Sequence, residues 1–558
     1  MASHMLGMRS SGSSILAVTV LASLLPFGGP ATAQTPSALA GKVTSQQEGA
    51  MEGVLVSAKR AGSTITISVI SNARGEFSFP RDRLEPGKYS VAIRAVGFEL
   101  PNAAQVEVTG KQPAALDLNL VKTKDLEHQL SSGEWLQSFP GTKPFKEALF
   151  NCTSCHTLER VAKSRYNAEE MGKVVQRMST WAQGSMPTQP QPQLGRKIGA
   201  PTSGQAALGK FISTINLSSG DPERPYPLKT DARPKGKATR VIITEYDLPR
   251  PLAMPHDAQL DARGMVWYSD FGAQYIGRLD PKTGKATEYQ IPVSKPGAPT
   301  GSLNVEFDRE GVLWIGNMMQ GSLVKFDPKT AKFQSWGSPT FLDRNEARIA
   351  MVTPVQRQVD GKVWIGGDNE YQVDLATGKW TTVDYLKGQP AGAKDHGSYG
   401  VAADSKNNFY GMELNADYII KVDAKSLTPT YYQTPTLNSG PRRGHFDNQD
   451  RLWFAENRGQ NIAMFDPKTG KFQEWKVPTP FATPYDAIFD DSTYAWTGGM
   501  ANDHVSRLNV KTGEIIDYLL PSETNIRRVD VDKSVNPSQL WVGNNHKATL
   551  VRVEPLEP

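Results

Sequence analysis

Cys152, Cys155 and His156 are the residues whose types and spacing could do the most specific chemistry. They lie in the run NCTSCHTLERV, and no other cysteine occurs in the 558 residues. Two thiols separated by two residues can add to the two vinyl groups on one edge of a porphyrin, and the histidine that follows directly can bind the iron as its proximal ligand. The run therefore predicts one covalently attached haem c.

Two other uses of paired cysteines fit the sequence less well. A zinc site needs four ligands, and the chain has no further cysteine to supply them. A redox pair of the thioredoxin type follows a strand and needs no adjacent histidine, whereas this pair lies among segments with helical periodicity. Covalent haem attachment is the interpretation that uses all three residues.

The segment around the motif, residues 126–218, places apolar residues at three- and four-residue spacing, as in NAEEMGKVVQRMSTWAQ and SGQAALGKFISTINL. With PFKEALFN as its first helix and QAALGKFISTIN as its last, it resembles small monohaem cytochromes c. The resemblance implies a small all-α domain in which a methionine is the distal iron ligand. We predict Met178, with Met186 in GSMPTQP as the alternative, and Met171 is the weakest of the three candidates.

The first 33 residues predict an export signal behind a short tag remnant. MASHM is typical of a vector, and Arg9 is followed by the apolar run ILAVTVLASLLPFGG and by the small-residue cleavage site ATA. Pro26 and Gly28 interrupt the run, which is short for a membrane span. We therefore expect a periplasmic or secreted protein without stable membrane insertion. The small net charge of +5 and the lack of long Lys/Arg blocks argue against nucleic acid as a partner.

Residues 36–123 alternate apolar and polar side chains in short runs such as GVLVSAKR, TITISVI and KYSVAIRAV. This period of two is typical of strands and predicts a small β-sandwich. The order of GKVTSQQEGAMEGVLVSAKR, SNARGEFSF and LEPGKYSVAIRAVGF resembles carboxypeptidase regulatory-like domains. The segment contains no acid–base pair or ligand cluster, so we expect an accessory module.

From residue 239 to 558 a unit of roughly forty to fifty residues recurs seven times. Its copies carry the aromatic strands VWYSD, LWIGN, VWIGG, FYGME, LWFAE, AWTGG and LWVGN, most of them followed by turns such as DPKTGK. The repeats predict a seven-bladed β-propeller, joined to the helical segment by a Pro- and Lys-rich linker at 219–238. The early strand VIITEYDLP should pair with LVRVEP at the end and close the ring. We expect the recurring aromatic residues to pack between blades.

The whole chain is thus predicted to be multidomain and mainly β, with an N-terminal β-sandwich, a small all-α cytochrome c domain and a C-terminal seven-bladed β-propeller. Units such as PHDAQLDARGMVWYSDFGAQYIGRLDPKTGKATEYQIP resemble the virginiamycin B lyase family of propellers. The resemblance implies an elimination reaction with a histidine base and acidic residues that hold Mg²⁺. His445 and Glu456 are the nearest counterparts here, whereas Arg443 occupies the register of the family's catalytic histidine. A divalent cation in the propeller thus joins the candidate cofactors, although the arginine cluster would repel it.

Polar residues about ten positions before each repeated aromatic should line the mouth of the central channel. The candidate catalytic residues there are His256, Arg443, His445 and Glu456, and the candidate substrate-binding residues are Asn304, Tyr399, Arg442, Tyr485 and Arg528. Such a ring of imidazoles, carboxylates and guanidiniums could bind a polar or anionic ligand or a cation. Residue by residue, a solvated loop or a hydrogen bond within a blade explains each of them as well.

Three functions fit these features. The first is an exported oxidoreductase or electron-transfer protein whose propeller binds a small polar or aromatic substrate, while the haem exchanges electrons with an external acceptor or donor. The second is a lyase of the virginiamycin B type with an ancillary cytochrome. The third is a ligand-binding or sensor protein without chemistry.

Overall fold

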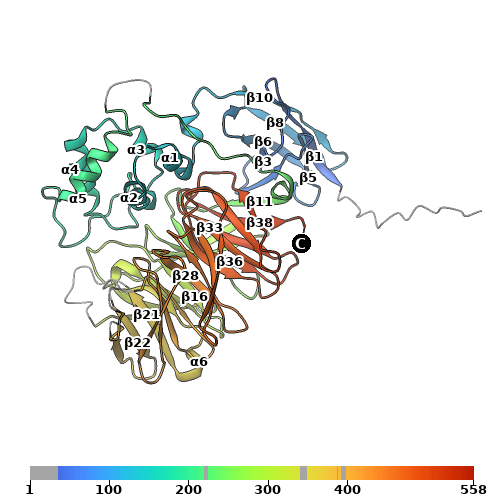
Figure 1. Ribbon diagram of the computed structural model, residues 1–558. Coiled ribbons are helices and arrows are strands. Elements are labelled where there is room, and N and C mark those ends of the chain that lie inside the picture. Colours follow the sequence, from blue (N-terminus) through green and yellow to red (C-terminus); the bar gives the residue numbers. More distant parts are fainter. Residues whose placement is uncertain are drawn as a thin grey trace, which may run out of the picture. The chain divides into compact units, whose positions relative to one another are not determined.

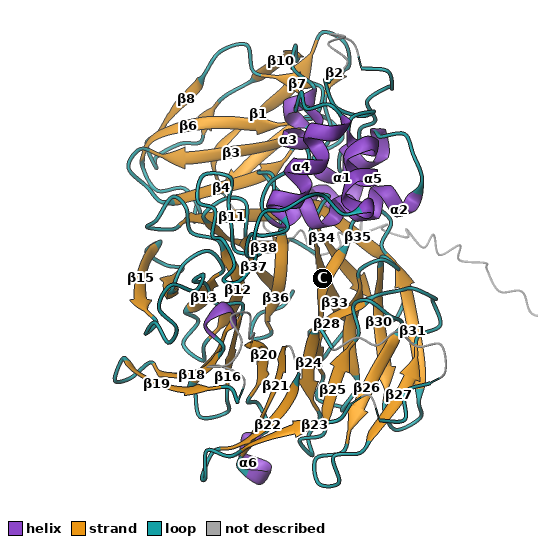
Figure 2. Ribbon diagram, turned by 90° about the vertical axis from the view of Figure 1, so that its left-hand side faces the viewer, coloured by secondary structure: helices purple, strands orange, loops and turns teal. Residues whose placement is uncertain are grey.

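Four-stranded antiparallel sheets follow one another along the C-terminal part of the protein, as the repeats predict (Figure 1). The computed structural model describes residues 36–218, 224–339, 349–367, 369–385, 387–390 and 398–557. The first strand of each sheet contacts the first strand of the next, and β36 (Ile526–Asp532) of the last contacts β12 (Pro255–Leu260) of the first. The first strands therefore form a closed ring of seven, which Figure 2 shows from another side.

Six of the blades are sheets of four strands in sequence order. They are β12, β13 (Val266–Asp270), β14 (Tyr275–Asp280) and β15 (Lys285–Gln290); β16 (Asn304–Phe307), β17 (Leu313–Asn317), β18 (Ser322–Asp327) and β19 (Lys332–Gly337); β20 (Ile349–Thr353), β21 (Lys362–Gly367), β22 (Glu370–Asp374) and β23 (Trp380–Val383); β24 (Gly400–Ala403), β25 (Phe409–Met412), β26 (Tyr418–Val422) and β27 (Pro429–Gln433); β28 (Pro441–Phe446), β29 (Leu452–Glu456), β30 (Asn461–Asp466) and β31 (Lys471–Lys476); and β32 (Pro484–Phe489), β33 (Tyr494–Gly499), β34 (His504–Asn509) and β35 (Ile515–Leu519). Short helices η4 (Met318–Gln320) and α6 (Arg357–Asp360) lie between strands of the second and third blades.

The seventh blade joins the start of the repeat region to its end. It contains β36, β37 (Gln539–Asn544), β38 (Thr549–Pro555) and β11 (Val241–Asp247). The β11 strand pairs antiparallel with β38 along its whole length, which confirms the predicted pairing of the first and last strands. On its other edge β11 pairs with a strand of the N-terminal domain, Ile243 lying opposite Ser68. This continuation of a blade into the sandwich was not expected from the sequence.

The N-terminal domain consists of ten short strands around one apolar core. They are β1 (Ser37–Ser45), β2 (Gly49–Ala50), β3 (Leu55–Arg60), β4 (Ile65–Ile70), β5 (Glu76–Pro80), β6 (Gly87–Arg94), β7 (Phe98–Glu99), β8 (Ala104–Val108), β9 (Ala114–Ala115) and β10 (Leu118–Lys122). One sheet is built around β1, β5 and β10, and the other continues from β4 through β3 and β6 to β8. Side chains from both sheets, such as Phe79 and Val56, share the core.

Helices fill the segment between the two β regions. They are η1 (Glu127–Gln129), α1 (Ser132–Ser138), α2 (Lys143–Ala148), η2 (Leu149–Ser154), α3 (Glu159–Ala162), α4 (Ala168–Met178) and α5 (Ser203–Ile212), followed by η3 (Gly236–Thr239) at the end of the linker. Capping boxes start α1, α4 and α5, where a Ser, Asn or Thr and the Glu or Gln three residues later bond to each other's backbone N–H groups. The helices pack on an apolar core that includes Trp135 and Phe211.

The repeated tryptophans are buried between blades, as predicted. Trp267, Trp314, Trp364, Trp453 and Trp496 are almost completely shielded from solvent. Trp453 stacks on Phe489 of the next blade, with 4.7 Å between ring centres. These residues pack neighbouring blades against each other.

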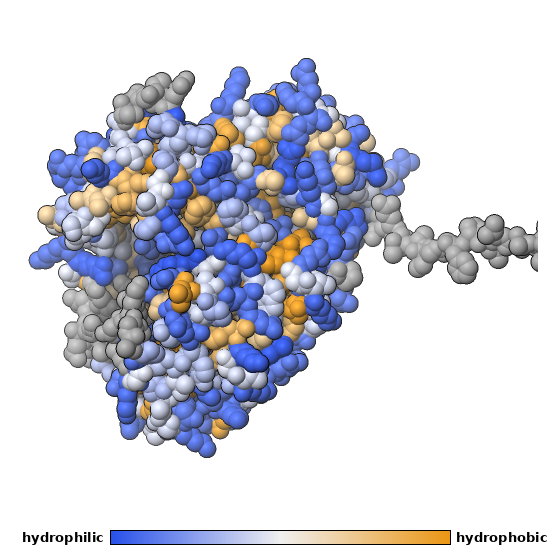
Figure 3. Space-filling view, in the orientation of Figure 1, coloured by the Kyte–Doolittle hydropathy of each residue, from blue (hydrophilic) through white to orange (hydrophobic). Residues whose placement is uncertain are grey.

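Within the described ranges, no helix is both long and apolar enough to cross a bilayer. On the face shown in Figure 3 hydrophilic side chains predominate, and apolar ones gather only in small patches. The predicted export signal at residues 1–33 lies outside the described residues, as do residues 219–223 of the predicted linker.

Candidate functional site

Four of the innermost strands begin with a β-bulge, and the bulge presents two consecutive side chains to the axis of the ring. In a regular strand consecutive side chains point to opposite faces, but an inserted residue breaks that alternation. The bulged pairs are His256–Asp257 on β12, Arg442–Arg443 on β28, Tyr485–Asp486 on β32 and Arg527–Arg528 on β36. Each pair has one member near the start of its strand and one deeper in the ring, so two layers of polar residues result.

The first layer contains a chain of hydrogen bonds from Tyr399 to Asp257. The hydroxyl of Tyr399 bonds to that of Tyr485. The Tyr485 hydroxyl lies 3.0 Å from Nε2 of His256, whose Nδ1 is 2.7 Å from the carboxylate of Asp257. Burial lowers the pKa of His256 to about 4 despite the carboxylate. The ring is therefore neutral at pH 7, with Nδ1–H donating to Asp257 and Nε2 accepting from Tyr485.

Two arginines of the first layer stack on these tyrosines. The guanidinium of Arg442 lies 4.1 Å from the ring centre of Tyr485 and 4.9 Å from that of Tyr399, and the guanidinium of Arg527 lies 5.3 Å from the ring centre of Tyr485. Burial lowers the pKa of Arg527, and the charge of Arg442 acts in the same direction. Although burial opposes it, the two guanidiniums lower the pKa of Tyr399. The first layer is thus strongly electropositive.

The cysteine motif lies against the same end of the ring. The backbone carbonyl of Thr153 accepts hydrogen bonds from Nδ2 of Asn525 (3.0 Å) and from Nε2 of His546 (2.8 Å). The next carbonyl, that of Ser154, is 3.5 Å from Arg527. We call this the motif end of the channel, defined by Cys152–His156 together with Tyr399, Arg442, Tyr485 and Arg527.

The motif residues fit the predicted attachment of haem. Both thiols are free, and Cys152 packs at the edge of the apolar core of the helical segment. The Nδ1 of His156 lies 2.8 Å from the carbonyl oxygen of Thr157. A carbonyl can only accept, so Nδ1 carries the proton and Nε2 keeps the lone pair that a metal needs. Two unpaired thiols and an oriented imidazole are therefore in place for a c-type haem.

The three candidate methionines have different surroundings. Met171 is buried in the helical core, where it serves packing. Met178 is the last residue of α4 and is half-buried. Met186 packs against a cluster at the motif end that includes Met254 and Met318 of the propeller. The distal ligand therefore stays a prediction, with Met178 and Met186 both near a domain surface.

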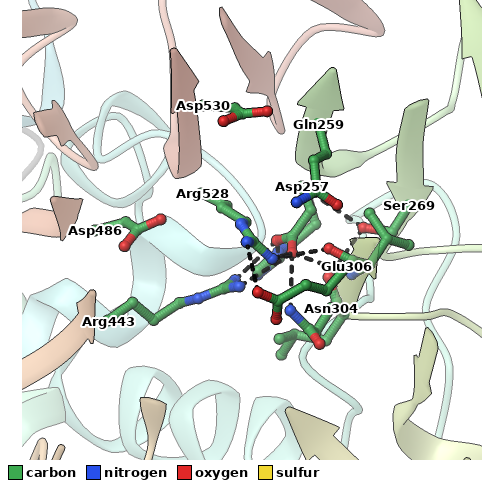
Figure 4. A network of polar contacts seen from close by, with 12 residues as sticks. Asp257, Gln259, Ser269, Asn304, Glu306, Arg443, Asp486, Arg528 and Asp530 are labelled. Atoms are coloured by element: carbon green, nitrogen blue, oxygen red, sulfur yellow. Dashed lines mark hydrogen bonds and ion pairs between the residues drawn. The ribbon is translucent and has the colours of Figure 1, made fainter. Parts of the chain in front are cut away.

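The second layer is a compact ion network around Asp257 (Figure 4). Both oxygens of Asp257 accept from Arg443, at 2.8 and 3.1 Å, and one oxygen lies 3.4 Å from Arg528. Asn304 Nδ2 is 3.3 Å from the same carboxylate. Although burial acts the other way, Arg443 holds the pKa of Asp257 well below its usual range. Arg443, Arg528 and Asn304 thus have structural partners here.

Beyond this network the channel opens into a cavity of about 570 Å³, which we call the far end. Its wall includes Glu306, His445 and Asp530, which lie toward the ends of the innermost strands. The Nε2 of His445 is 2.9 Å from Asp486, and the buried carboxylate of Asp486 also accepts from the backbone N–H of Val529. A carboxylate that orients a histidine in this way is typical of a general base.

The predicted pair of His445 and Glu456 is not brought together. On the paired strands β28 and β29, His445 lies opposite Trp453 whereas Glu456 lies opposite Pro441. The offset is about 10 Å along the strand. Glu456 is buried within its blade, where it accepts from Asn461 at 2.7 Å, and burial raises its pKa to about 8. The described residues contain no group of three or more His, Cys, Asp or Glu side chains that could hold a metal ion.

Other predicted residues do meet. His256, Tyr399, Arg442 and Tyr485 gather at the motif end, and Arg443, Arg528 and Asn304 form the second layer. Asn525 and Glu306 were not predicted from the sequence as residues of the channel. Glu306 carried a usable signal, because it lies two residues after Asn304 on the same face of β16. Asn525 had none, since its role depends on the helical segment that packs on it.

Comparisons with known proteins concern parts of the chain. Residues 38–121 match the family model of the carboxypeptidase regulatory-like domain. A solved structure of virginiamycin B lyase from Staphylococcus aureus is 19% identical over 56% of this chain and 98% of its own, with a TM-score of 0.47. A streptogramin B lyase structure is 18% identical over 57% of this chain and 99% of its own, with a TM-score of 0.48. A search of curated proteins gives no match. Residues 38–121 are therefore a carboxypeptidase regulatory-like domain. The similarity to the two lyase structures covers little more than half of the chain.

Proposed function

We propose that the protein is an exported oxidoreductase or electron-transfer protein. Cys152 and Cys155 would attach one haem c through thioether bonds, and His156 would be the proximal ligand. When bound, this group supplies one-electron transfer. The propeller would bind a small polar or aromatic substrate at the motif end, and an external acceptor or donor would exchange electrons with the protein.

One observation carries the proposal, namely the seating of the motif on the first layer of the channel. Asn525 and His546 hold the carbonyl of Thr153, and Arg527 reaches the carbonyl of Ser154. These contacts come from the seventh blade and fix the short helix η2 in place. A ligand held by Arg442 and Arg527 would therefore lie beside the cysteines, and short distances favour electron transfer.

The hydrogen-bonded chain at the motif end supports the same function. Oxidation of an O–H or N–H group releases protons as well as electrons. Tyr399, Tyr485 and His256 form a continuous path from the motif end to Asp257, which is the anion of the second layer. The neutral His256 can take a proton at Nε2 while Asp257 stabilises the resulting cation. The residues of this chain would thus hold or move a proton.

The test is the absorption spectrum of the purified, exported protein during a screen of candidate compounds. Reduction of the haem iron by a substrate, seen as a change in the haem absorption band and lost in the Arg527→Gln variant, would support the proposal. Replacing Met178 and Met186 one at a time by Ala identifies the distal ligand, because only loss of the true ligand changes the spectrum of the resting protein. A haem that forms but is reduced by none of the substrates that the propeller binds would contradict it.

A lyase-like function is the second candidate, favoured by the His445–Asp486 pair at the far end. The imidazole lines the cavity, and Asp486 would stabilise its protonated form. This reaction would need no electron acceptor. Turnover that continues with the iron kept oxidised and no acceptor present, and that stops in His445→Ala, would favour it over the redox function.

A further inference from the structure

Arg442 and Arg527 lack the counter-ions that their neighbours in the sequence have. Within the described part of the chain neither forms an ion pair with a carboxylate, whereas Arg443 and Arg528 both contact Asp257. Arg527 is only 2% exposed, and Arg442 is half-buried. The buried Nε atoms of both side chains also have no hydrogen-bond partner. Arg527 is thus a buried charge beside a second, half-buried one, and a buried charge without a counter-ion is costly. An anionic ligand would supply the counter-ion that the described residues do not.

The surroundings of the two guanidiniums define what that ligand looks like. Their aromatic neighbours are Tyr485, Tyr399 and Phe271, the last with its ring centre 5.6 Å from the guanidinium of Arg527. Phe271 also belongs to the apolar cluster that contains Met254, and Tyr399 packs against that cluster. A cationic pair beside aromatic and methionine side chains suits an anionic head on an apolar body.

From these contacts we infer that Arg442 and Arg527 form a binding site for the carboxylate of an aromatic or otherwise apolar acid, beside Cys155. The planar fork of a guanidinium matches a carboxylate in two hydrogen bonds, and two forks can hold one carboxylate from both sides. This inference deepens the proposed function and rests on it for the identity of the site as a substrate site.

The carboxylate has two conceivable sources with the same chemistry. One is a freely diffusing acid, which would be the substrate. The other is the pair of propionate groups that every c-type porphyrin carries. The nearness of the site to the cysteine motif, through Arg527 and the carbonyl of Ser154, admits both sources. A comparison of ligand binding by haem-containing protein and by protein without attached haem distinguishes the two sources.

The experiment measures the binding of benzoate by calorimetry and by the thermal midpoint Tm, with benzamide as the neutral control and with ionic strength held constant. The wild-type protein is compared with a full-length Cys152→Ala/Cys155→Ala variant that cannot attach haem. Arg442→Gln and Arg527→Gln remove one guanidinium each. Arg278→Gln is the matched control, because Arg278 stacks on Trp267 at 5.7 Å on a strand of the first blade, away from the motif end.

Benzoate should raise Tm and benzamide should not. Each of Arg442→Gln and Arg527→Gln should weaken benzoate binding at least tenfold, and Arg278→Gln should leave it unchanged. Arg442→Gln should not lower the Tm measured without ligand, because it removes like-charge repulsion and breaks no ion pair. A merely structural arginine would lower it.

Each outcome bears on the inference. Binding to the wild type supports a free acid as the ligand, and binding only to the variant without cysteines supports the propionates. Binding of benzoate no tighter than of benzamide to both proteins overturns the carboxylate site. Failure of the haem proposal is seen separately, since the wild type would then be colourless whether or not it binds benzoate.

Discussion

The two layers of the propeller channel hold arginines in opposite electrostatic settings, although the residues are adjacent in sequence. Arg443 and Arg528 in the second layer share the carboxylate of Asp257. Arg442 and Arg527 in the first layer have aromatic faces and a backbone carbonyl as partners. A β-bulge at each strand start separates the members of each pair. The second layer therefore serves stability, whereas the first keeps an unbalanced charge for a ligand.

The largest expected effect is the difference in stability between two variants, each of which replaces one arginine of one layer. Arg443→Gln should lower the free energy of unfolding by about 3 kcal/mol, because the fully buried carboxylate of Asp257 loses its closer guanidinium and keeps only Arg528, at 3.4 Å, as a charged arginine partner. Arg442→Gln, one residue away, should change it by less than about 1 kcal/mol, since no ion pair is lost. Chemical denaturation of both variants measures the difference. Equal losses in the two would show that the layers do not differ.

A second prediction concerns pH. The pKa of His256 is about 4 in the folded protein and about 6.5 when unfolded. Below pH 6.5 the unfolded state binds the proton first, so this residue makes the protein less stable as the pH falls from 6.5 to 4, with no further loss below that. His256→Asn should reduce the loss over this range by about 3 kcal/mol. His128→Asn, at an exposed site, is the control. An unchanged pH dependence in His256→Asn would mean that the ring is not held neutral.

A smaller effect is expected from cutting the hydrogen-bonded chain in the first layer. Tyr485→Phe removes the bonds to Tyr399 and to His256, and should cost about 1–2 kcal/mol of stability. Tyr289→Phe is the control, because its hydroxyl has no hydrogen bond to a described residue while its ring stacks on Trp267. Thermal unfolding of the two variants checks this. Equal thermal midpoints for Tyr485→Phe and Tyr289→Phe would indicate that the hydroxyl of Tyr485 does not belong to a chain of hydrogen bonds.

Local pattern was enough to predict the blades and the closing strand pair. An aromatic residue at each blade period, Trp in six copies and Tyr410 in the other, indicates a buried position, and the alternation within β11 and β38 marks both as strands. The sequence could not show that β11 has a second partner in β4, because a strand edge carries no mark of what covers it. Likewise, the separation of His445 from Glu456 follows from the pairing of β28 with β29, which the sequence order alone does not give.

The channel was predictable only as a set of polar positions. His256, Tyr399, Arg442 and Tyr485 contact one another in the structure, and each precedes a repeated aromatic by a similar number of residues. Their division into two layers depends on bulges, whose position is decided by backbone packing in the finished ring. The doublets HD, RR, YD and RR at strand starts are the one sequence signal for it. Only the three-dimensional structure shows whether a carboxylate lies close enough to an arginine to be its counter-ion.

The most direct test of the central claim, that the motif carries haem, is the intact mass and colour of the mature protein. Produced with its export signal in a host that attaches c-type haem, the protein should be heavier than its polypeptide by one haem and should stay coloured after acid–acetone extraction. Cys152→Ala/Cys155→Ala should lose both properties. A colourless wild-type protein with the mass of the bare polypeptide would contradict the claim.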